Sequence, residues 1–277
     1  MKMKKLITLV ATVAVLAGSL TGCGTKTSTS NTENNVIKVA ASATPHAEIL
    51  EAAKALLKEK GYELEIKIFE DYILPNNVVD SGEFDANYFQ HVQYLESFNE
   101  EHNTNLVIAG KIHYEPFGIY PGKKTDLSTL TAGDVIAIPN DSSNETRALK
   151  LLEEKGIITL KEGVGIEATV MDIKENPYDI KFEELDAAQI PRIREEVSFA
   201  VINGNYALAA GLSVTEDSVF YEDADSGNAK TYVNVIAVKE GNESLEKIKA
   251  LVEVLKSDEI KQFIEDNYKD SVIVFEE

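Results

Sequence analysis

Short runs of β-branched residues alternate with stretches of helical periodicity along most of this 277-residue chain. Such alternation is typical of parallel sheets flanked by helices. The clearest unit begins with a predicted buried strand at residues 36–40, after which Thr44 and Pro45 supply a helix N-cap and a first-turn proline. Apolar residues then recur on one helical face as far as Gly61, a typical helix end. The pattern predicts an α/β fold that begins near Val36.

The remaining elements follow from the same periodicities. Further strands are predicted at residues 64–69, 106–109, 135–138, 168–173, 199–202 and 233–238, with helices between most of them. A helix at 145–155 and another at 244–256 have clear apolar faces, and the second pattern continues after a break at 260–268.

Two interruptions of the alternation predict a two-lobed organisation. The segment from Pro116 to Gly122 breaks the pattern near the middle of the chain, and the polar stretch 222–230 breaks it again before the last predicted strand. We therefore expect residues 36–118 plus 233–277 to form lobe 1 and residues 119–232 to form lobe 2. Each lobe is expected to contain a mixed, mostly parallel sheet flanked by helices. A cleft at the hinge is the expected ligand site.

The N-terminal segment has the composition of a secretory signal. Lys2, Lys4 and Lys5 precede an apolar run at residues 6–20, which is too short to span a bilayer comfortably. Residues 1–22 are predicted to be removed as a signal peptide.

Cys23 is the sole cysteine, so disulfides within the chain are excluded. The run Leu20-Thr21-Gly22-Cys23 resembles the lipobox of bacterial lipoproteins, whose cysteine is acylated and becomes the new N-terminus. The resemblance implies attachment to the extracytoplasmic face of the cell membrane through a lipid such as palmitate. Residues 24–35 contain no aliphatic or aromatic side chain, so residues 23–35 are predicted to be a flexible tether.

The formal net charge of −20 limits the partners of the chain. Nucleic acid is not expected as a partner, and an anionic membrane surface would repel the protein. Contact with the membrane is therefore expected through the lipid anchor only.

Five separated segments resemble the NlpA-type methionine-binding lipoproteins of bacterial ABC importers. They are DANYFQH at 85–91, IPNDSSNETRAL at 138–149, AQIPR at 188–192, INGNYA at 202–207 with AGL at 210–212, and YVN at 232–234. They occur in the family's order over essentially the whole mature chain. One departure is GNAKT at 227–231, where family members usually have a shorter Ser-Pro lead, and it bears on the geometry of that loop.

The resemblance implies a two-lobed periplasmic-binding-protein-like fold that closes on L-methionine, with D-methionine, a close derivative or a methionine-containing dipeptide as the alternative ligands. It also implies delivery of the ligand to an ABC permease and its ATPase, with no reaction catalysed and no cofactor. The alternative functions are a lipid-tethered interaction or adhesion protein with an unused cleft, and an importer lipoprotein that binds a metal.

Arg147 is the candidate receptor for the ligand carboxylate. Residues 141–144 offer several N-cap side chains, Asn144 among them, so the predicted helix at 145–155 places Arg147 in the first turn. A helix N-terminus and an arginine fork together suit a carboxylate. The alternative is an ordinary ion pair with Glu145 or Asp141 on an exposed helix start.

Two asparagines are candidates for orienting a zwitterion. Asn203 follows one predicted strand and Asn234 lies inside another, where amides can donate to a carboxylate or accept from an ammonium. Local turn chemistry is the alternative, and it suits Asn203-Gly204 better than Asn234.

The ligand side chain requires an apolar slot with aromatic edges, because thioether sulfur packs well against rings. Ordinary core packing is the alternative for any single aromatic residue. Of Tyr88, Phe89, His91, His113 and Tyr114, we expect Tyr88, His91 and His113 to contact the ligand, and Glu115 to be available for the ammonium.

Other chemistry has weaker support. Four histidines, His46, His91, His102 and His113, could suggest a transition metal, but none has close metal-ligand spacing, and no metal site is predicted. The Gly-x-Ser-x-Gly motif of serine hydrolases and phosphate-binding loops are absent from the sequence.

Overall fold

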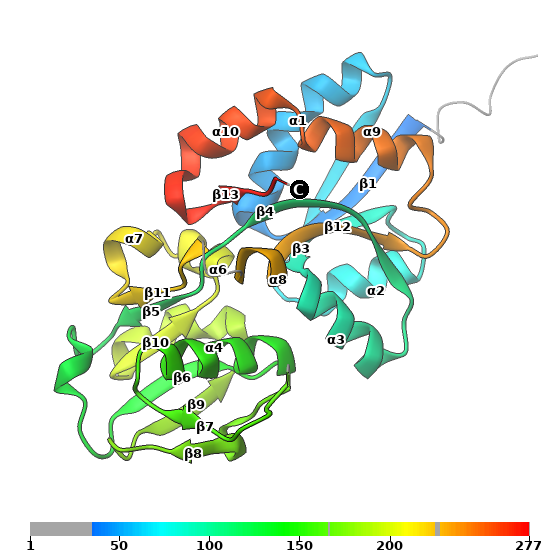
Figure 1. The fold of residues 1–277 in the computed structure, drawn as a ribbon. Helices are drawn as coiled ribbons and strands as arrows, with labels where there is room; N and C mark the ends of the chain where they lie inside the picture. The colour runs from blue at the N-terminus through cyan, green and yellow to red at the C-terminus, as the bar shows by residue number, and fades with distance from the viewer. Residues whose placement is uncertain (1–34, 166, 225–227, 277) are drawn as a thin grey trace, which may run out of the picture. The chain divides into compact units, whose positions relative to one another are not determined.

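The computed structural model describes residues 35–165, 167–224 and 228–276 (Figure 1). The predicted signal peptide at 1–22, the predicted lipidation site Cys23 and the rest of the predicted tether up to residue 34 lie outside the described residues. Within the described part, no helix is both long enough and apolar enough to cross a membrane.

The first of two large sheets contains six strands in the order β13-β4-β12-β3-β1-β2. Strand β1 pairs in parallel with β2 and β3, whereas β12 runs antiparallel to β3 and β4, and β13 antiparallel to β4. The strands are β1 (Val36–Ala41), β2 (Glu63–Ile68), β3 (Ala86–His91), β4 (Leu106–Tyr114), β12 (Val233–Lys239) and β13 (Ile273–Val274).

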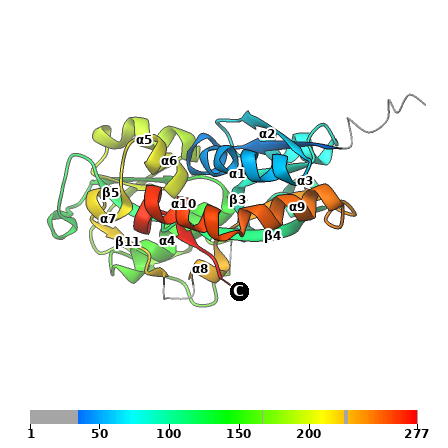
Figure 2. The same cartoon turned by 90° about the horizontal axis from the view of Figure 1, so that it is seen from above.

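Helices cover both faces of this sheet, as the alternation along β12 shows. Ile236 and Val238 belong to a core cluster with residues of α1, α9 and α10, and these three helices lie close together in Figure 2. Val233, Val235 and Ala237 pack on the other side with residues of α2 and α3. The helices are α1 (Glu48–Glu59), α2 (Leu74–Asp80), α3 (Val92–His102), α9 (Glu246–Leu255) and α10 (Asp258–Tyr268).

The second large sheet contains five strands in the order β11-β5-β10-β6-β9. Strand β6 pairs in parallel with β9 and β10, whereas β5 runs antiparallel to β10 and β11. One face packs against α4, and the other carries residues of α5 and α6. The elements are β5 (Gly118–Pro121), β6 (Val135–Pro139), β9 (Lys181–Leu185), β10 (Phe199–Ile202), β11 (Phe220–Tyr221), α4 (Ser142–Glu154), α5 (Ile190–Ile193) and α6 (Gly204–Ala209).

The chain crosses between the sheets twice. It leaves the first sheet after β4, enters the second at β5, and returns from β11 through α8 (Asn228–Thr231) to β12. In Figure 1 the first sheet therefore combines blue and cyan strands with orange and red ones from the other end of the chain. The predicted α/β, two-lobed fold is confirmed. The exact lobe boundaries, 36–118 plus 233–277 and 119–232, stay a proposal.

Two details of the sequence-based expectation are wrong. Parallel pairs do not predominate, because the returning strand β12 and the crossing strand β5 both run antiparallel to their neighbours. The strand predicted at 168–173 is also replaced, by a 3-10 helix at Val170–Asp172 followed by β8 (Ile173–Glu175). Thr169 and Asp172 form a capping box, in which each side chain accepts a hydrogen bond from a backbone nitrogen at the opposite end of this turn. These bonds stabilise the turn against an extended conformation.

Candidate functional site

A pocket lies where β3, β6 and β10 end. The carboxyl ends of parallel strands are the usual place for a ligand in α/β sheets, because the loops there diverge. Residues associated with both large sheets line it: Tyr72, Phe89, Gln90, His91, Tyr94, Glu115, Asn144, Arg147, Asn203, Gly204, Asn205 and Asn234.

The structure brings six of the eight predicted ligand-binding residues to this pocket. They are Arg147, Asn144, Asn203, Asn234, His91 and Glu115. Tyr88 and His113 are not among its lining residues and are fully buried. The alternation along β3 explains why Tyr88 does not line the pocket, because its side chain belongs to the core cluster on the α1 side of the sheet.

Three aromatic lining residues were not expected to contact the ligand, and they differ in how strongly the sequence indicates them. Phe89 lies two residues before His91 on the same strand, so strand alternation could have favoured it over Tyr88. Tyr94 could have been inferred from its position one helical turn after His91. Tyr72 belongs to the segment between β2 and α2 and carries no local signal of a site.

The polarity of the pocket is set by the start of α4. Asp141 is the N-cap, and its Oδ1 accepts from both the backbone nitrogen and the Nδ2 of Asn144, at 3.0 and 2.8 Å. The amide of Asn144 therefore turns its Oδ1 the other way. That oxygen accepts from Nε2 of His91 at 3.1 Å and from Nδ2 of Asn203 at 2.8 Å.

This chain of bonds leaves an acceptor without a donor. Because Nδ2 of Asn203 is engaged by Asn144, its Oδ1 is the remaining polar atom of the amide. That oxygen is buried and has no hydrogen-bond partner among the described residues. An unsatisfied buried acceptor costs about 1–3 kcal/mol. A ligand that donates a hydrogen bond here would remove this cost.

Arg147 lies in the second turn of α4, because Asp141 starts the helix at Ser142, three residues before the predicted start. The side chain is only 4% exposed. Its Nε donates to Oε1 of Glu222 at 2.8 Å, and its Nη2 donates to Oε2 of the same carboxylate at 2.5 Å. The predicted alternative of an exposed helix-start pair with Glu145 or Asp141 is therefore wrong.

The ion pair has a consequence for mutagenesis. Both side chains are almost fully buried, so removing Arg147 alone would leave Glu222 as an uncompensated buried charge. Breaking a buried pair in this way costs about 3–5 kcal/mol of folding stability. Arg147→Ala therefore reports folding as well as any role in ligand binding, and ligand analogues are the cleaner probe.

Three aromatic rings form an apolar wall of the pocket. The ring centroids of Tyr72 and Phe89 are 5.6 Å apart, and that of Tyr94 lies 5.4 Å from Tyr72 and 5.9 Å from Phe89. Hydrogen bonds fix two of the rings, because Tyr72 donates to Oδ1 of Asn205 and Tyr94 donates to the carbonyl of Tyr72. Such rings suit a flexible apolar side chain or a thioether.

Glu115 is the acidic group of the pocket. Its Oε1 lies 2.7 Å from Nε2 of His113 and 3.4 Å from Nε2 of His46. Burial raises the pKa of the Glu115 carboxyl. A Cβ on Gly204 would lie 2.7 Å from the Cβ of Glu115, so this close approach requires glycine after Asn203.

The same cluster contains three possible metal ligands. Atoms of His46, His113 and Glu115 all lie within 4.8 Å of one another. Each imidazole, however, has hydrogen-bond partners at both nitrogens. His46 pairs with Ser42 and Asn234, and His113 pairs with Tyr88 and Glu115. The bonding capacity of the two histidines is therefore satisfied without a metal ion.

The buried histidines predict acid sensitivity. Burial lowers the pKa of His91 to about 3, that of His113 to about 3 and that of His46 to about 4. In the unfolded chain a histidine has a pKa of about 6.5. Between these values the unfolded state binds protons that the folded state does not, so stability falls as pH drops below about 6.5.

A variant of His91 tests this sign. Its Nδ1 caps α3 by accepting from the backbone nitrogen of Tyr94, and asparagine can serve as that cap without titrating. Between pH 7 and pH 5, the free energy of unfolding of His91→Asn should fall by about 2 kcal/mol less than that of the parent. Urea titrations at both pH values measure it. An equal fall in the two proteins would show that His91 is not held neutral.

Comparisons with known proteins agree with one another. The family model described as NlpA lipoprotein matches residues 37–275. The chain is 41% identical over 275 residues to the methionine-binding lipoprotein of Bacillus subtilis, covering 98% of each. Among solved structures it is similar to a lipoprotein from Ruminococcus gnavus, at 64% identity and a TM-score of 0.87 over 87% of this chain and 100% of that one. A nutrient binding protein from Burkholderia cenocepacia bound to methionine is 42% identical, with a TM-score of 0.82 over 86% and 99% of the two chains.

Proposed function

This chain belongs to the NlpA lipoprotein family, and we propose that it captures methionine outside the cytoplasm and delivers it to an ABC importer. The family resemblance inferred from the five sequence segments is confirmed. The relatives described above are named as lipoproteins or binding proteins, and none of those names states a reaction. A binding role without catalysis is the coarse function of the family.

The observation that carries the proposal is the pairing of opposite polarities in one pocket. Arg147 offers a donor, because its hydrogen bonds to Glu222 and to the carbonyl of Glu115 come from Nε and Nη2, which leaves Nη1 for a ligand. Asn203 offers an acceptor, the unpartnered Oδ1, and Glu115 adds a carboxylate. A free α-amino acid has a carboxylate that can accept from Arg147 and an ammonium that can donate to Asn203 and Glu115. We assign the carboxylate to Arg147 and the ammonium to Asn203 and Glu115.

The ligand side chain belongs against the wall of Tyr72, Phe89 and Tyr94. An unbranched thioether can follow such a surface and makes favourable contacts with ring edges. The methionine bound to the Burkholderia cenocepacia relative supports methionine in particular.

Contacts to both lobes give the ligand a means of favouring closure. Arg147 and Asn203 come from elements of the second sheet, whereas His91 and Asn234 lie on strands of the first. A ligand that touches both sides stabilises the closed state by its differential affinity for that state. Closure is the proposed signal for delivery to the permease and its ATPase.

Calorimetry with modified ligands tests the assignment. Methionine should bind, and neither its methyl ester nor N-acetylmethionine should bind well, since each loses one charge that the pocket is proposed to meet. The expected loss is about 30-fold or more for each, as for truncation of a buried charged contact.

Three outcomes would contradict the proposal. An ester that bound within threefold of methionine would remove the carboxylate from recognition. Binding that disappeared with a strong chelator would favour a metal at His46, His113 and Glu115. No binding of any amino acid would favour an interaction protein with an unused pocket.

We further propose that Cys23 carries the lipid anchor on the extracytoplasmic face of the membrane. The support is the lipobox-like run in the sequence and membership of a lipoprotein family. In the native host, Cys23→Ser should move the protein from the membrane fraction to the soluble extracytoplasmic fraction and leave methionine affinity unchanged. Fractionation with immunoblotting measures this, and a variant that still sediments with membranes would argue against the anchor.

A further inference from the structure

Glu222 is the side chain that accepts two hydrogen bonds from Arg147. Besides the two bonds from Arg147, its Oε2 accepts from the hydroxyl of Tyr114 at 2.5 Å and from the backbone nitrogen of Phe117 at 3.1 Å. The backbone nitrogen of Glu222 donates to the carbonyl of Phe117 at 3.0 Å. The residue is 2% exposed. Its carboxylate is therefore fixed from several directions.

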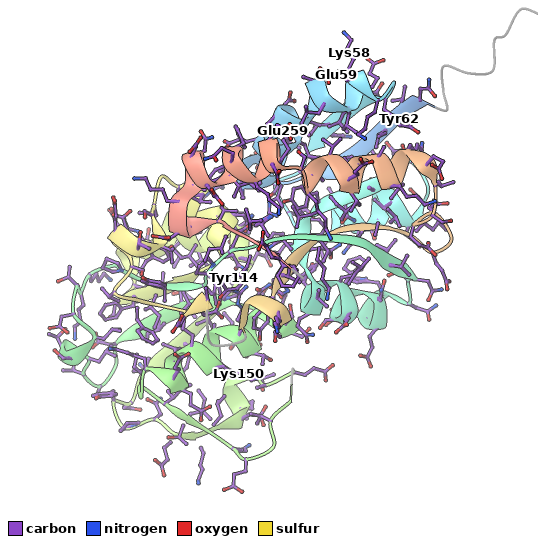
Figure 3. The ribbon with its side chains drawn as sticks, turned by 45° about the horizontal axis from the view of Figure 1, so that its top comes forward. Lys58, Glu59, Tyr62, Tyr114, Lys150 and Glu259 are labelled. Carbon is purple, nitrogen blue, oxygen red and sulfur yellow. The ribbon has the colours of Figure 1, made fainter. Side chains whose placement is uncertain are left out.

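These contacts come from the two segments where the chain crosses between the sheets. Tyr114 ends β4, and Figure 3 labels it in the middle of the molecule. Phe117 immediately precedes β5, and Glu222 immediately follows β11. Glu222 lies 75 residues from Arg147 in the sequence. A long-range contact of this kind joins α4 to both crossings.

Aromatic rings restrict the guanidinium further. Its central carbon lies 4.2 Å from the ring centroid of Tyr232, 4.8 Å from that of Phe117 and 5.7 Å from that of Tyr114. Rings near the guanidinium and a carboxylate on its Nε edge leave little freedom to rotate. The bonds to Glu222 and to the carbonyl of Glu115 come from Nε and Nη2, so we infer that Nη1 is the nitrogen left for a ligand.

We propose that Glu222 is a positioning residue that holds Arg147 with Nη1 facing the ligand, and that it thereby sets selectivity for a free carboxylate. The inference rests on the proposed function, in which Arg147 receives the ligand carboxylate. Glu222 itself does not line the pocket. It acts through the orientation of Arg147.

Two physical effects of Glu222 on the ligand have opposite signs. Its negative charge opposes a second carboxylate near Arg147, which alone would weaken methionine binding. Its two parallel bonds fix the planar fork, which strengthens binding because the ligand need not order the arginine. Glu222→Gln removes the charge and also the second acceptor. Tighter methionine binding would show that charge repulsion dominates, and weaker binding would show that ordering of the arginine dominates.

The experiment compares methionine with methioninamide, which keeps the ammonium and the side chain but lacks the carboxylate. In the parent, methionine should bind more tightly. Glu222→Gln should weaken methionine binding by about tenfold or more and change methioninamide binding by less than about twofold. Competition calorimetry gives both dissociation constants.

Asp134→Asn is the matched control. Asp134 is also a paired carboxylate associated with the second sheet, since it accepts from Lys124 and Ser198, but it precedes β6 at the end away from the pocket. Its variant should leave the ratio of the two dissociation constants unchanged. Tyr114→Phe removes one bond to Glu222 and keeps the ring. Like Glu222→Gln, it should weaken methionine binding relative to methioninamide binding, by about two- to fivefold.

The outcomes separate the inference from the proposed function. A parent that does not favour methionine over methioninamide contradicts the proposed function, and the inference fails with it. A parent that does so, with Glu222→Gln weakening both ligands equally or leaving methionine binding unchanged or tighter, overturns only the positioning role. If Glu222→Gln does not fold, the ratio for Tyr114→Phe decides, and an unchanged ratio overturns the positioning role.

Discussion

The N-cap of α4 is the interaction on which the pocket depends. Asp141 accepts two bonds from Asn144, and this sets both where the helix begins and which way the Asn144 amide points. From that amide, donor and acceptor roles pass to His91 and Asn203. A capping contact that stabilises a helix by about 1 kcal/mol thus also determines which atom is left for a ligand.

The ion pair between Arg147 and Glu222 is a second constraint, and it acts on the donor side of the pocket. The charge of Arg147 is neutralised within the protein by Glu222, so the arginine does not depend on a ligand for its partner. Recognition of a carboxylate then relies on the direction of the free donors more than on net charge. The pocket therefore combines a preformed donor with an unsatisfied acceptor, the arrangement that an amino-acid zwitterion matches.

Local patterns predicted most of the fold, and long-range contacts limited the prediction of the site. The strands at β1, β6, β10 and β12 were visible because short apolar runs between turn residues are encoded locally. Glu222 carries no signal in the sequence, since its role comes from an ion pair across 75 residues. Tyr88 was predicted in place of Phe89 because composition does not say which face of β3 points to the pocket.

The most direct test of the account is a crystal structure of the protein with methionine bound. The ligand carboxylate should lie at Nη1 of Arg147 and the ammonium within hydrogen-bond distance of Oδ1 of Asn203, with the bonds between Arg147 and Glu222 still in place. A ligand carboxylate that displaced Glu222 from Arg147, or an ammonium bound away from Asn203, would contradict it.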